Sequence, residues 1–379
     1  MKNQKMIAAG HICIDITPVI KSEKVENIAE VLIPGGLVHT GNVDIHTGGS
    51  VANTGLAMKI LGGDVSLMGK VGQDEFGRII LNILNQYEAG AGMIVDESSA
   101  TSYSVVLAIP GIDRIFLHNP GANDTFSVED LNMEQIKTAT LFHFGYPPLM
   151  ASLYKSNGEQ LTELFQKVKS ADVMTSMDMA AVNENSEAGQ MDWEFILRKT
   201  LPFVDFFFPS FEEICFMLNK DKYHMLSKKA DKKDMTTILN IKEDVEPLAN
   251  DIISMGVKLV IIKCGAAGFY YKTADEKAFA QLKKCSDLDF SLFANKEGFE
   301  KSFVPDAVIS GTGAGDTTIA AFLTAMVQGY PFERCLQLAA ATGASCVASV
   351  DALSGLKSFD ALLNKIDAGW KKQNILDEI

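Results

Sequence analysis

The chain has 379 residues, of which 47% are hydrophobic and 22% charged, as in a globular protein with one large α/β domain and an accessory element, or with two domains. Its formal net charge of -14 argues against nucleic acid as a principal partner, because phosphate backbones require a basic surface. No apolar run approaches the length of a membrane-spanning helix, so we expect no membrane partner.

The first elements are expected to be a strand and then hairpins. Residues 6–16 form an apolar stretch that we interpret as a first core strand, with Asp15 near its exit. Short apolar runs separated by glycine or asparagine, such as 31–33, predict hairpin strands within 19–47 and again within 101–118. These hairpins interrupt the core and predict a small β-lid.

The rest of the chain alternates between strand and helix patterns. Expected strands are 65–71, 141–144, 173–177, 204–208 and 257–263, and expected helices are near 50–62, 76–87, 158–170, 192–200, 316–329 and 333–350. Such alternation is typical of crossover units on a parallel sheet. We therefore predict a doubly wound α/β fold, with a mainly parallel central sheet flanked by helices and a small β-lid.

The same patterns divide the chain into a core and a lid. The predicted core comprises residues 1–18, 48–100 and 119–379, and the predicted lid comprises 19–47 and 101–118. Two stretches without clear alternation, about 219–243 and 275–300, are interpreted as surface insertions. The first is rich in lysine, which is typical of a solvated helix or loop.

Six scattered cysteines indicate the cellular compartment. They form no Cys-x-x-Cys pair, and several lie in apolar runs, such as Cys13 between two isoleucines. This pattern predicts buried free thiols in a reducing environment. The N-terminal residues also lack a long apolar signal region, so we expect a cytoplasmic protein.

The stretch from Ser310 to Asp316 contains three glycines and an alanine and leads into a predicted helix. Unpaired N–H groups and the positive end of the helix dipole suit a phosphate, and the same dipole should keep the Asp316 carboxylate charged. That carboxylate can take a proton from an attacking hydroxyl, which indicates phosphoryl transfer to an alcohol. Taken alone, the stretch is equally typical of a tight strand-to-helix turn. It matches neither a P-loop nor a dinucleotide-binding fingerprint.

Three further motifs precede this stretch in the chain. They are Gly10 with Asp15, then Gly48-Gly49 with Asn53, and the glycine-bearing segment 61–77. Together with residues 313–316 they resemble the ribokinase-like (PfkB-type) carbohydrate kinases, over about residues 6–356. The resemblance implies ATP-dependent phosphorylation of a hydroxyl, in particular a hydroxymethyl group, on a small sugar or sugar derivative.

The resemblance also implies roles for individual residues. Asp316 would be the general base, and the backbone of Gly313, Ala314 and Gly315 would form the anion hole for the transferred phosphate. On the sugar side, a carboxylate such as Asp15 can accept hydrogen bonds from two hydroxyls. Gly48 and Gly49 would let the backbone approach the substrate, and Asn53 would bind another hydroxyl.

Nucleotide and metal binding are implied in the same way. Lys263, Gly265 and Gly268 match the strand and turn beside the ATP phosphates, and Glu213 matches the glutamate that organises the waters of Mg²⁺. Ser210 replaces the usual asparagine of that motif, and its hydroxyl can still hold a water of Mg²⁺. Ser310-Gly311 replaces an Asp-Thr pair that helps bind a monovalent cation in relatives, which argues against activation by K⁺.

The substrate is left open by the sequence. Arginines at 78, 114, 198 and 334 are far apart, which favours an unphosphorylated sugar or sugar acid. Strand-exit residues Tyr146 and Asp178 could face either substrate or nucleotide. A nucleoside kinase and a catalytically weak sugar-binding regulator of the same fold are the alternatives, whereas a dehydrogenase lacks its glycine fingerprint. Exposed lid strands would allow a homodimer through the β-lid.

Overall fold

A computed structural model describes residues 4–112, 115–231, 233–285 and 288–376. An eight-stranded sheet lies at its centre, in the order β14-β13-β12-β11-β10-β9-β1-β4. The strands are β1 (Lys5–Gly10), β4 (Asp64–Met68), β9 (Leu141–Gly145), β10 (Met174–Met177), β11 (Phe206–Phe207), β12 (Leu259–Lys263), β13 (Gly268–Thr273) and β14 (Glu297–Lys301). Pairing from β4 to β12 is parallel, and β13 and β14 are antiparallel. The predicted mainly parallel sheet is confirmed.

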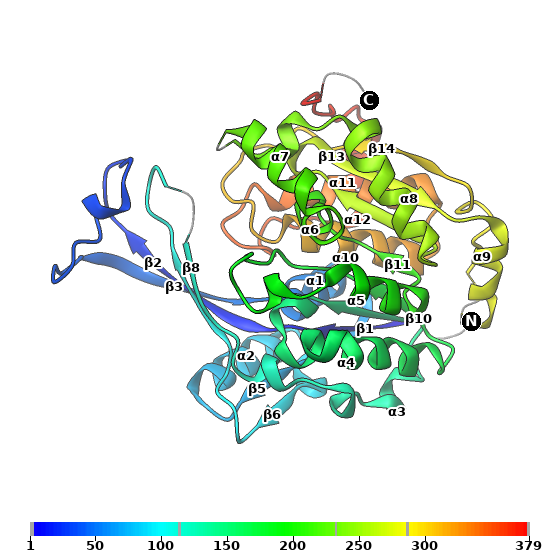
Figure 1. The fold of residues 1–379 in the computed structure, drawn as a ribbon, viewed down its shortest axis with the longest axis horizontal. Coiled ribbons are helices and arrows are strands. Elements are labelled where there is room, and N and C mark those ends of the chain that lie inside the picture. The colour runs from blue at the N-terminus through cyan, green and yellow to red at the C-terminus, as the bar shows by residue number, and fades with distance from the viewer. Residues whose placement is uncertain (1–3, 113–114, 232, 286–287, 377–379) are drawn as a thin grey trace.

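Helices cover both faces of this sheet, because its strands are apolar on both sides. One hydrophobic cluster includes residues of α3 (Met133–Ile136), α4 (Ala151–Lys169), α5 (Trp193–Thr200), α6 (Phe211–Leu218) and α8 (Glu246–Ser254). The other includes α1 (Ser50–Ile60), α2 (Glu75–Gln86), α10 (Ala314–Val327), α11 (Phe332–Cys346) and α12 (Phe359–Asp367). Figure 1 shows α4, α5, α6 and α8 in front of the sheet, with α10 and α11 behind it.

A second sheet of four strands forms the lid. Its order is β3-β2-β7-β8, with β2 (Cys13–Ile20), β3 (Thr40–Gly48), β7 (Tyr103–Leu107) and β8 (Ile115–Asn119). These strands project beyond the core on the left of Figure 1. The predicted hairpin regions supply β3, β7 and β8, and residues 14–16 of β2 connect the two regions by pairing with β7.

Two local predictions about these strands are wrong. Residues 12–16 do not continue the first core strand: Gly10 ends β1 with a φ of 124°, and β2 then pairs with β3 and β7 in the lid sheet. Residues 13–18, predicted as core, therefore lie in the lid sheet. Residues 31–33 are not a strand, because a short 3-10 helix at Ile28–Glu30, capped by Asn27, is followed by turns.

The two predicted insertions differ in character. Residues 219–243 contain α7 (Lys220–Ala230) and short helical turns. Lys228, Lys229 and Lys233 are exposed, as expected, whereas Leu226, Met235, Leu239 and Ile241 are buried in the core. Residues 275–300 include α9 (Glu276–Ala280) and part of the edge strand β14, and three of their four phenylalanines, Phe279, Phe290 and Phe293, are at most 7% exposed. Phe293 packs on Phe332 of α11 at a ring-centroid distance of 5.0 Å. This stretch is core, and its interpretation as a surface insertion is wrong. Lys232 of the first stretch and residues 286–287 of the second lie outside the described residues.

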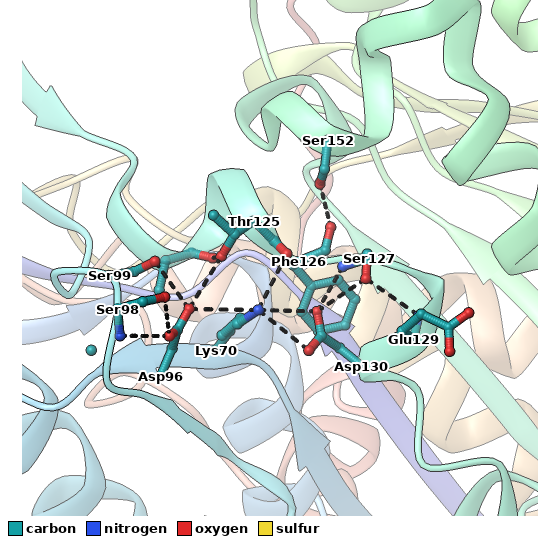
Figure 2. A network of polar contacts seen from close by, with 12 residues as sticks. Lys70, Asp96, Ser98, Ser99, Thr125, Phe126, Ser127, Glu129, Asp130 and Ser152 are labelled. Carbon is teal, nitrogen blue, oxygen red and sulfur yellow. Dashed lines mark hydrogen bonds and ion pairs between the residues drawn. The ribbon is translucent and has the colours of Figure 1, made fainter.

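A network of hydrogen bonds and ion pairs holds residues 123–130, which follow the lid strand β8, in place (Figure 2). Lys70, in a two-stranded ribbon of β5 (Lys70–Gly72) and β6 (Ile94–Asp96), donates to both carboxylate oxygens of Asp130 at 3.3 Å and to the Thr125 carbonyl at 3.2 Å. It also lies 3.7 Å from Asp96. In the same segment Asn123 binds the backbone N–H and carbonyl of Ile12. The ribbon thus anchors the chain where β2 begins.

We expect Lys70→Ala to lower the free energy of unfolding by about 2 kcal/mol, because it leaves two largely buried carboxylates without their cation. Their side chains are 15% and 17% exposed. Urea unfolding measures the change. Lys59→Ala is the control: its amine makes one exposed bond to the Glu88 carbonyl, and its loss should cost less than about 0.5 kcal/mol. Equal effects of the two substitutions would contradict the anchoring role.

Two further sequence expectations concern cysteines and membranes. All six cysteines are buried and free, as predicted. Among the described residues, no helix is both long enough and apolar enough to span a bilayer.

Candidate active site

Two cavities meet at the carboxyl edge of the central sheet, beside the first turn of α10. The lid-side cavity, of about 790 Å³, is lined by residues that include His11, Asp15, Phe116, His118 and Tyr154. The helix-side cavity, of about 530 Å³, is lined by residues that include Asp178, Lys263, Gly265, Ala340 and Gly343. Four residues line both cavities: Tyr146, Glu213, Gly313 and Asp316. A group bound on one side can therefore reach a group bound on the other.

Asp316 lies at this junction and is 4% exposed. The Tyr146 hydroxyl lies 2.7 and 2.9 Å from its two oxygens, Asn53 Nδ2 donates to Oδ2 at 3.1 Å, and Thr54 donates to Oδ1 at 3.3 Å. Burial raises the pKa of Asp316, while the Tyr146 bond and the charge of Lys263 act in the opposite direction. The helix terminus was expected to favour the charged form, but burial has the larger effect.

Gly313 is the N-cap of α10, with a left-handed φ of 75°. A Cβ at this position would lie 2.2 Å from the Cβ of Ala352, so both the backbone angle and the space require glycine. Ala314 and Gly315 begin the helix, where N–H groups lack intrahelical partners. The Ala314 N–H donates to Gly311 at 3.3 Å, a long bond that an anion can replace. The turn can therefore bind an anion next to Asp316.

Asp15 lies on β2, paired across the lid sheet with His46 of β3. It lines the lid-side cavity, and its burial raises its pKa. A Cβ on Gly48 would lie 2.3 Å from the Asp15 carboxylate, and one on Gly49 would lie 2.6 Å from His11 Nδ1. The two glycines thus make room for side chains that line the cavity, a reason that differs from the predicted approach of backbone to ligand.

Asn53 is the third residue predicted on the sugar side. It lies on α1, is 8% exposed and lines the lid-side cavity. Its amide nitrogen is already bonded to Asp316, so the side chain connects the lid-side cavity with the acid at the junction.

The residues predicted for the nucleotide side lie around the helix-side cavity. Lys263, at the end of β12, forms a 2.7 Å ion pair with Asp178, and its amine is 3.7 Å from the Cβ position of Gly315. Gly265 and Gly268 flank the following turn and line the cavity. These glycines make room for the Thr236 hydroxyl and the Glu300 carbonyl, which a Cβ would approach within 2.4 and 2.1 Å. The lysine is thus held beside the turn at the start of α10.

Glu213 lies in the first turn of α6 and lines both cavities. One of its oxygens accepts the Ser210 N–H at 2.7 Å, in a reciprocal capping box with the Ser210 hydroxyl. Within the described residues, no group of three acids, histidines or cysteines is placed to hold a metal by itself. A metal here would need ligands from a bound phosphate, which is the usual mode for Mg²⁺.

Sequence reasoning missed the importance of three strand-end residues. His11, Tyr146 and Asp178 each follow directly on a parallel strand, namely β1, β9 and β10. Tyr146 and Asp178 were recognised as strand exits without a role, and His11 was not singled out. The usable signal was their shared position, because the carboxyl ends of parallel strands meet at one edge of the sheet.

His11 is buried among other rings of the lid-side cavity. Its ring centroid is 5.3 Å from that of His118 and 6.1 Å from that of Tyr146. Burial lowers its pKa to about 3, so the imidazole is neutral. Within the described part of the chain, neither ring nitrogen has a hydrogen-bond partner. A ligand in this cavity can therefore supply one.

Comparisons with known protein sequences show what this chain is similar to. A sequence model of the pfkB family carbohydrate kinases matches residues 4–358. An uncharacterised sugar kinase of Archaeoglobus fulgidus is 23% identical, with 79% of this chain and 98% of the relative aligned. Rice fructokinase-2 is 26% identical, with 72% and 71% aligned.

Solved structures of similar fold include two with relevant ligands. A fructokinase from Xylella fastidiosa with bound ATP superposes with a TM-score of 0.70, at 18% identity, covering 97% of this chain and 99% of that one. A putative ribokinase II from Escherichia coli, in complex with ATP and Mg²⁺, gives 0.70 at 21% identity, covering 96% and 99%.

Proposed function

Because the chain belongs to the pfkB family of carbohydrate kinases, we propose that it transfers the γ-phosphate of ATP to a hydroxyl, preferably a hydroxymethyl group, of a small neutral sugar or sugar derivative. The observation that carries this proposal is the buried Asp316 carboxylate at the junction of two cavities, next to a helix N-terminus that can hold an anion. One cavity would hold the sugar, and the other ATP.

In this proposal, Asp15 orients the sugar through its hydroxyls in the lid-side cavity. Asp316 takes the proton of the acceptor hydroxyl, whose oxygen forms a bond to the γ-phosphorus while the bond to the bridging β–γ oxygen breaks and ADP leaves. The backbone N–H groups of residues 313–315 stabilise the charge on the γ-phosphate oxygens. Lys263 would exchange its contact with Asp178 for the phosphates.

Glu213 is the residue of this site that would help to bind Mg²⁺. Mg²⁺ binds through one or two carboxylates together with phosphates and water, and Glu213 lines both cavities where such waters would lie. When bound, Mg²⁺ would neutralise charge on the ATP phosphates. For K⁺, Ser310 offers a hydroxyl that already accepts the Thr312 N–H at 3.1 Å, in place of a carboxylate. We therefore propose activity that depends on Mg²⁺ but not on K⁺.

Charge in the lid-side cavity supports a neutral acceptor. Its lining includes the carboxylates of Asp15, Asp124 and Glu187 in addition to the two at the junction, and none of its described lining residues is lysine or arginine. Arg78, Arg198 and Arg334 form ion pairs elsewhere, and Arg114 lies outside the described residues. A carboxylate or phosphate on the sugar would find no compensating cation. Sugar acids are therefore less favoured than the sequence suggested.

A nucleoside is the second candidate acceptor, for a specific reason. The lid-side cavity has an apolar wall that includes Phe116, Pro148, Leu149, Tyr154 and Val182. Such a wall would stack and enclose a base attached to the sugar. The intact Asp316 and glycine turn argue against the third alternative, a sugar-binding regulator without catalysis.

The lid strands and the cysteines bear on two properties outside the site, assembly and location. Exposed apolar residues on the lid strands, such as Val19, Val43 and Ile45, support a homodimer through the β-lid. Buried free cysteines support a cytoplasmic location.

The proposal is tested by ADP release from Mg-ATP across neutral sugars, polyols, sugar acids, sugar phosphates and nucleosides. We expect turnover with neutral sugars, and a kcat/KM at least about tenfold lower for the matching sugar acid, because the unpaired charge must be buried. Preference for a nucleoside would favour the second candidate. Sugar binding without turnover on any acceptor would support the regulatory alternative, and a preference for the sugar acid would contradict the charge argument.

A further inference from the structure

Tyr146 has an unusual backbone and an unusual position. It follows β9 directly with a left-handed φ of 66° and precedes two prolines. A residue with a side chain rarely adopts this conformation, and it persists where surrounding structure enforces it, often at functional sites. The conformation brings the ring to the junction, where it lines both the lid-side and the helix-side cavities.

The hydroxyl of Tyr146 makes the shortest contacts with Asp316, 2.7 and 2.9 Å from its two oxygens, whereas Asn53 and Thr54 each contact one oxygen at 3.1 and 3.3 Å. An ionised carboxylate offers about four acceptor positions. Three donors therefore leave one position for the hydroxyl of an incoming acceptor.

We propose that Tyr146 is a positioning residue for phosphoryl transfer: its hydroxyl fixes the orientation of the Asp316 carboxylate and favours its charged form. This inference rests on the proposed function. The acceptor proton goes to Asp316, and Tyr146 keeps its own proton throughout the reaction. Burial and the neighbouring Asp316 charge raise the pKa of Tyr146 well above its ordinary value, so the phenol stays a donor.

Other groups around Asp316 also affect its charge, and they come from every neighbouring element. They are Asn53 and Thr54 on α1, Asp178 after β10, Lys263 on β12 and Cys346 on α11. Glu213 on α6 acts on Tyr146 and Asp178 rather than on Asp316 directly. Lys263 favours the charged carboxylate and Asp178 disfavours it. Removing the Tyr146 hydroxyl alone leaves all of these in place, so its effect can be separated from theirs.

The test is Tyr146→Phe, which keeps the ring and removes the hydroxyl. With a turned-over acceptor, we expect kcat to fall about 10- to 100-fold with KM changed less than about threefold, since a hydrogen bond to a charged group is lost. The Tyr146 bond lowers the pKa of Asp316, so its loss should move the acidic limb of the kcat profile to higher pH. Tyr330→Phe, beyond the far end of α10, is the control and should change neither value.

Two additions keep the test decisive. If Tyr146→Phe does not fold, 3-fluorotyrosine at position 146 preserves the shape and strengthens the donor, and the acidic limb should then move to lower pH. If the wild type phosphorylates no acceptor, the proposed function fails. An infrared titration of the Asp316 carboxyl, taken as the difference from Asp316→Asn, then reads its protonation directly. A higher midpoint in Tyr146→Phe supports the inference. The inference is overturned if Tyr146→Phe leaves both kcat and the acidic limb of its pH profile unchanged, or if it leaves the infrared midpoint of the Asp316 carboxyl unchanged.

Discussion

Asp316→Asn is expected to reduce turnover by about 10²–10⁴-fold while acceptor affinity changes little, because the asparagine amide matches the carboxylate in shape but cannot take a proton. ADP release at saturating substrates measures kcat, and calorimetry measures acceptor binding. Asp360→Asn is a matched control, since Asp360 is an exposed acid in the first turn of α12, away from both cavities. It should alter kcat less than twofold. A kcat for Asp316→Asn within tenfold of the wild type would remove Asp316 as the base.

The pH dependence of kcat in the wild type is a second test of Asp316. The base must be charged, so kcat should fall as pH falls through the pKa of Asp316. Burial raises that pKa, which places the acidic limb above the ordinary range of an aspartate. The residual activity of Asp316→Asn should lack this limb. A limb that persists unchanged in the variant would have to be assigned to another acid.

Gly313→Ala should combine a loss of stability with a loss of catalysis. Its Cβ would lie 2.2 Å from that of Ala352, and the φ of 75° disfavours any side chain. Strain and overpacking together should lower the free energy of unfolding by about 2–4 kcal/mol. Because the helix start must shift, the proposed anion hole would be displaced, and kcat should fall by at least about 100-fold. Urea unfolding and ADP release measure the two effects.

Gly329→Ala is the control that separates the effect of backbone strain from that of a steric clash. Gly329 lies just beyond the other end of α10, with a φ of 84° and no neighbouring atom within 4 Å of its Cβ position. This substitution should cost only about 1 kcal/mol and leave kcat unchanged, because it carries the backbone strain without the clash. If the two variants lose stability and activity equally, the clash with Ala352 has no consequence and the explanation for Gly313 is wrong.

Some features were predictable because their signals are local. The alternation from residue 141 onward predicted the parallel sheet, since helix and strand periodicities are properties of neighbouring residues. The bare backbone of residues 310–316 predicted a helix start that can hold an anion, which is where α10 begins. The order of four motifs along the chain identified the family, and this resemblance supplied the expected roles of Asp316 and Asp15.

Other features could not be predicted because they depend on contacts between distant segments. The Tyr146–Asp316 hydrogen bond joins residues 170 positions apart, and the Asn53–Asp316 bond joins residues 263 apart. Residues 275–300 were interpreted as a surface insertion, but Phe279, Phe290 and Phe293 pack on one another, and Phe293 packs on α11. Likewise, only strand pairing assigns residues 13–18 to the lid sheet.

The sequence by itself therefore determined the fold class and the family, because these follow from local patterns and from motif order. Only the tertiary structure decided which donors hold Asp316, that Gly48 and Gly49 make room for Asp15 and His11, and that the lid-side cavity is acidic without a described cation. Each of these results from strand order and lid placement bringing distant side chains together, and no local pattern encodes it.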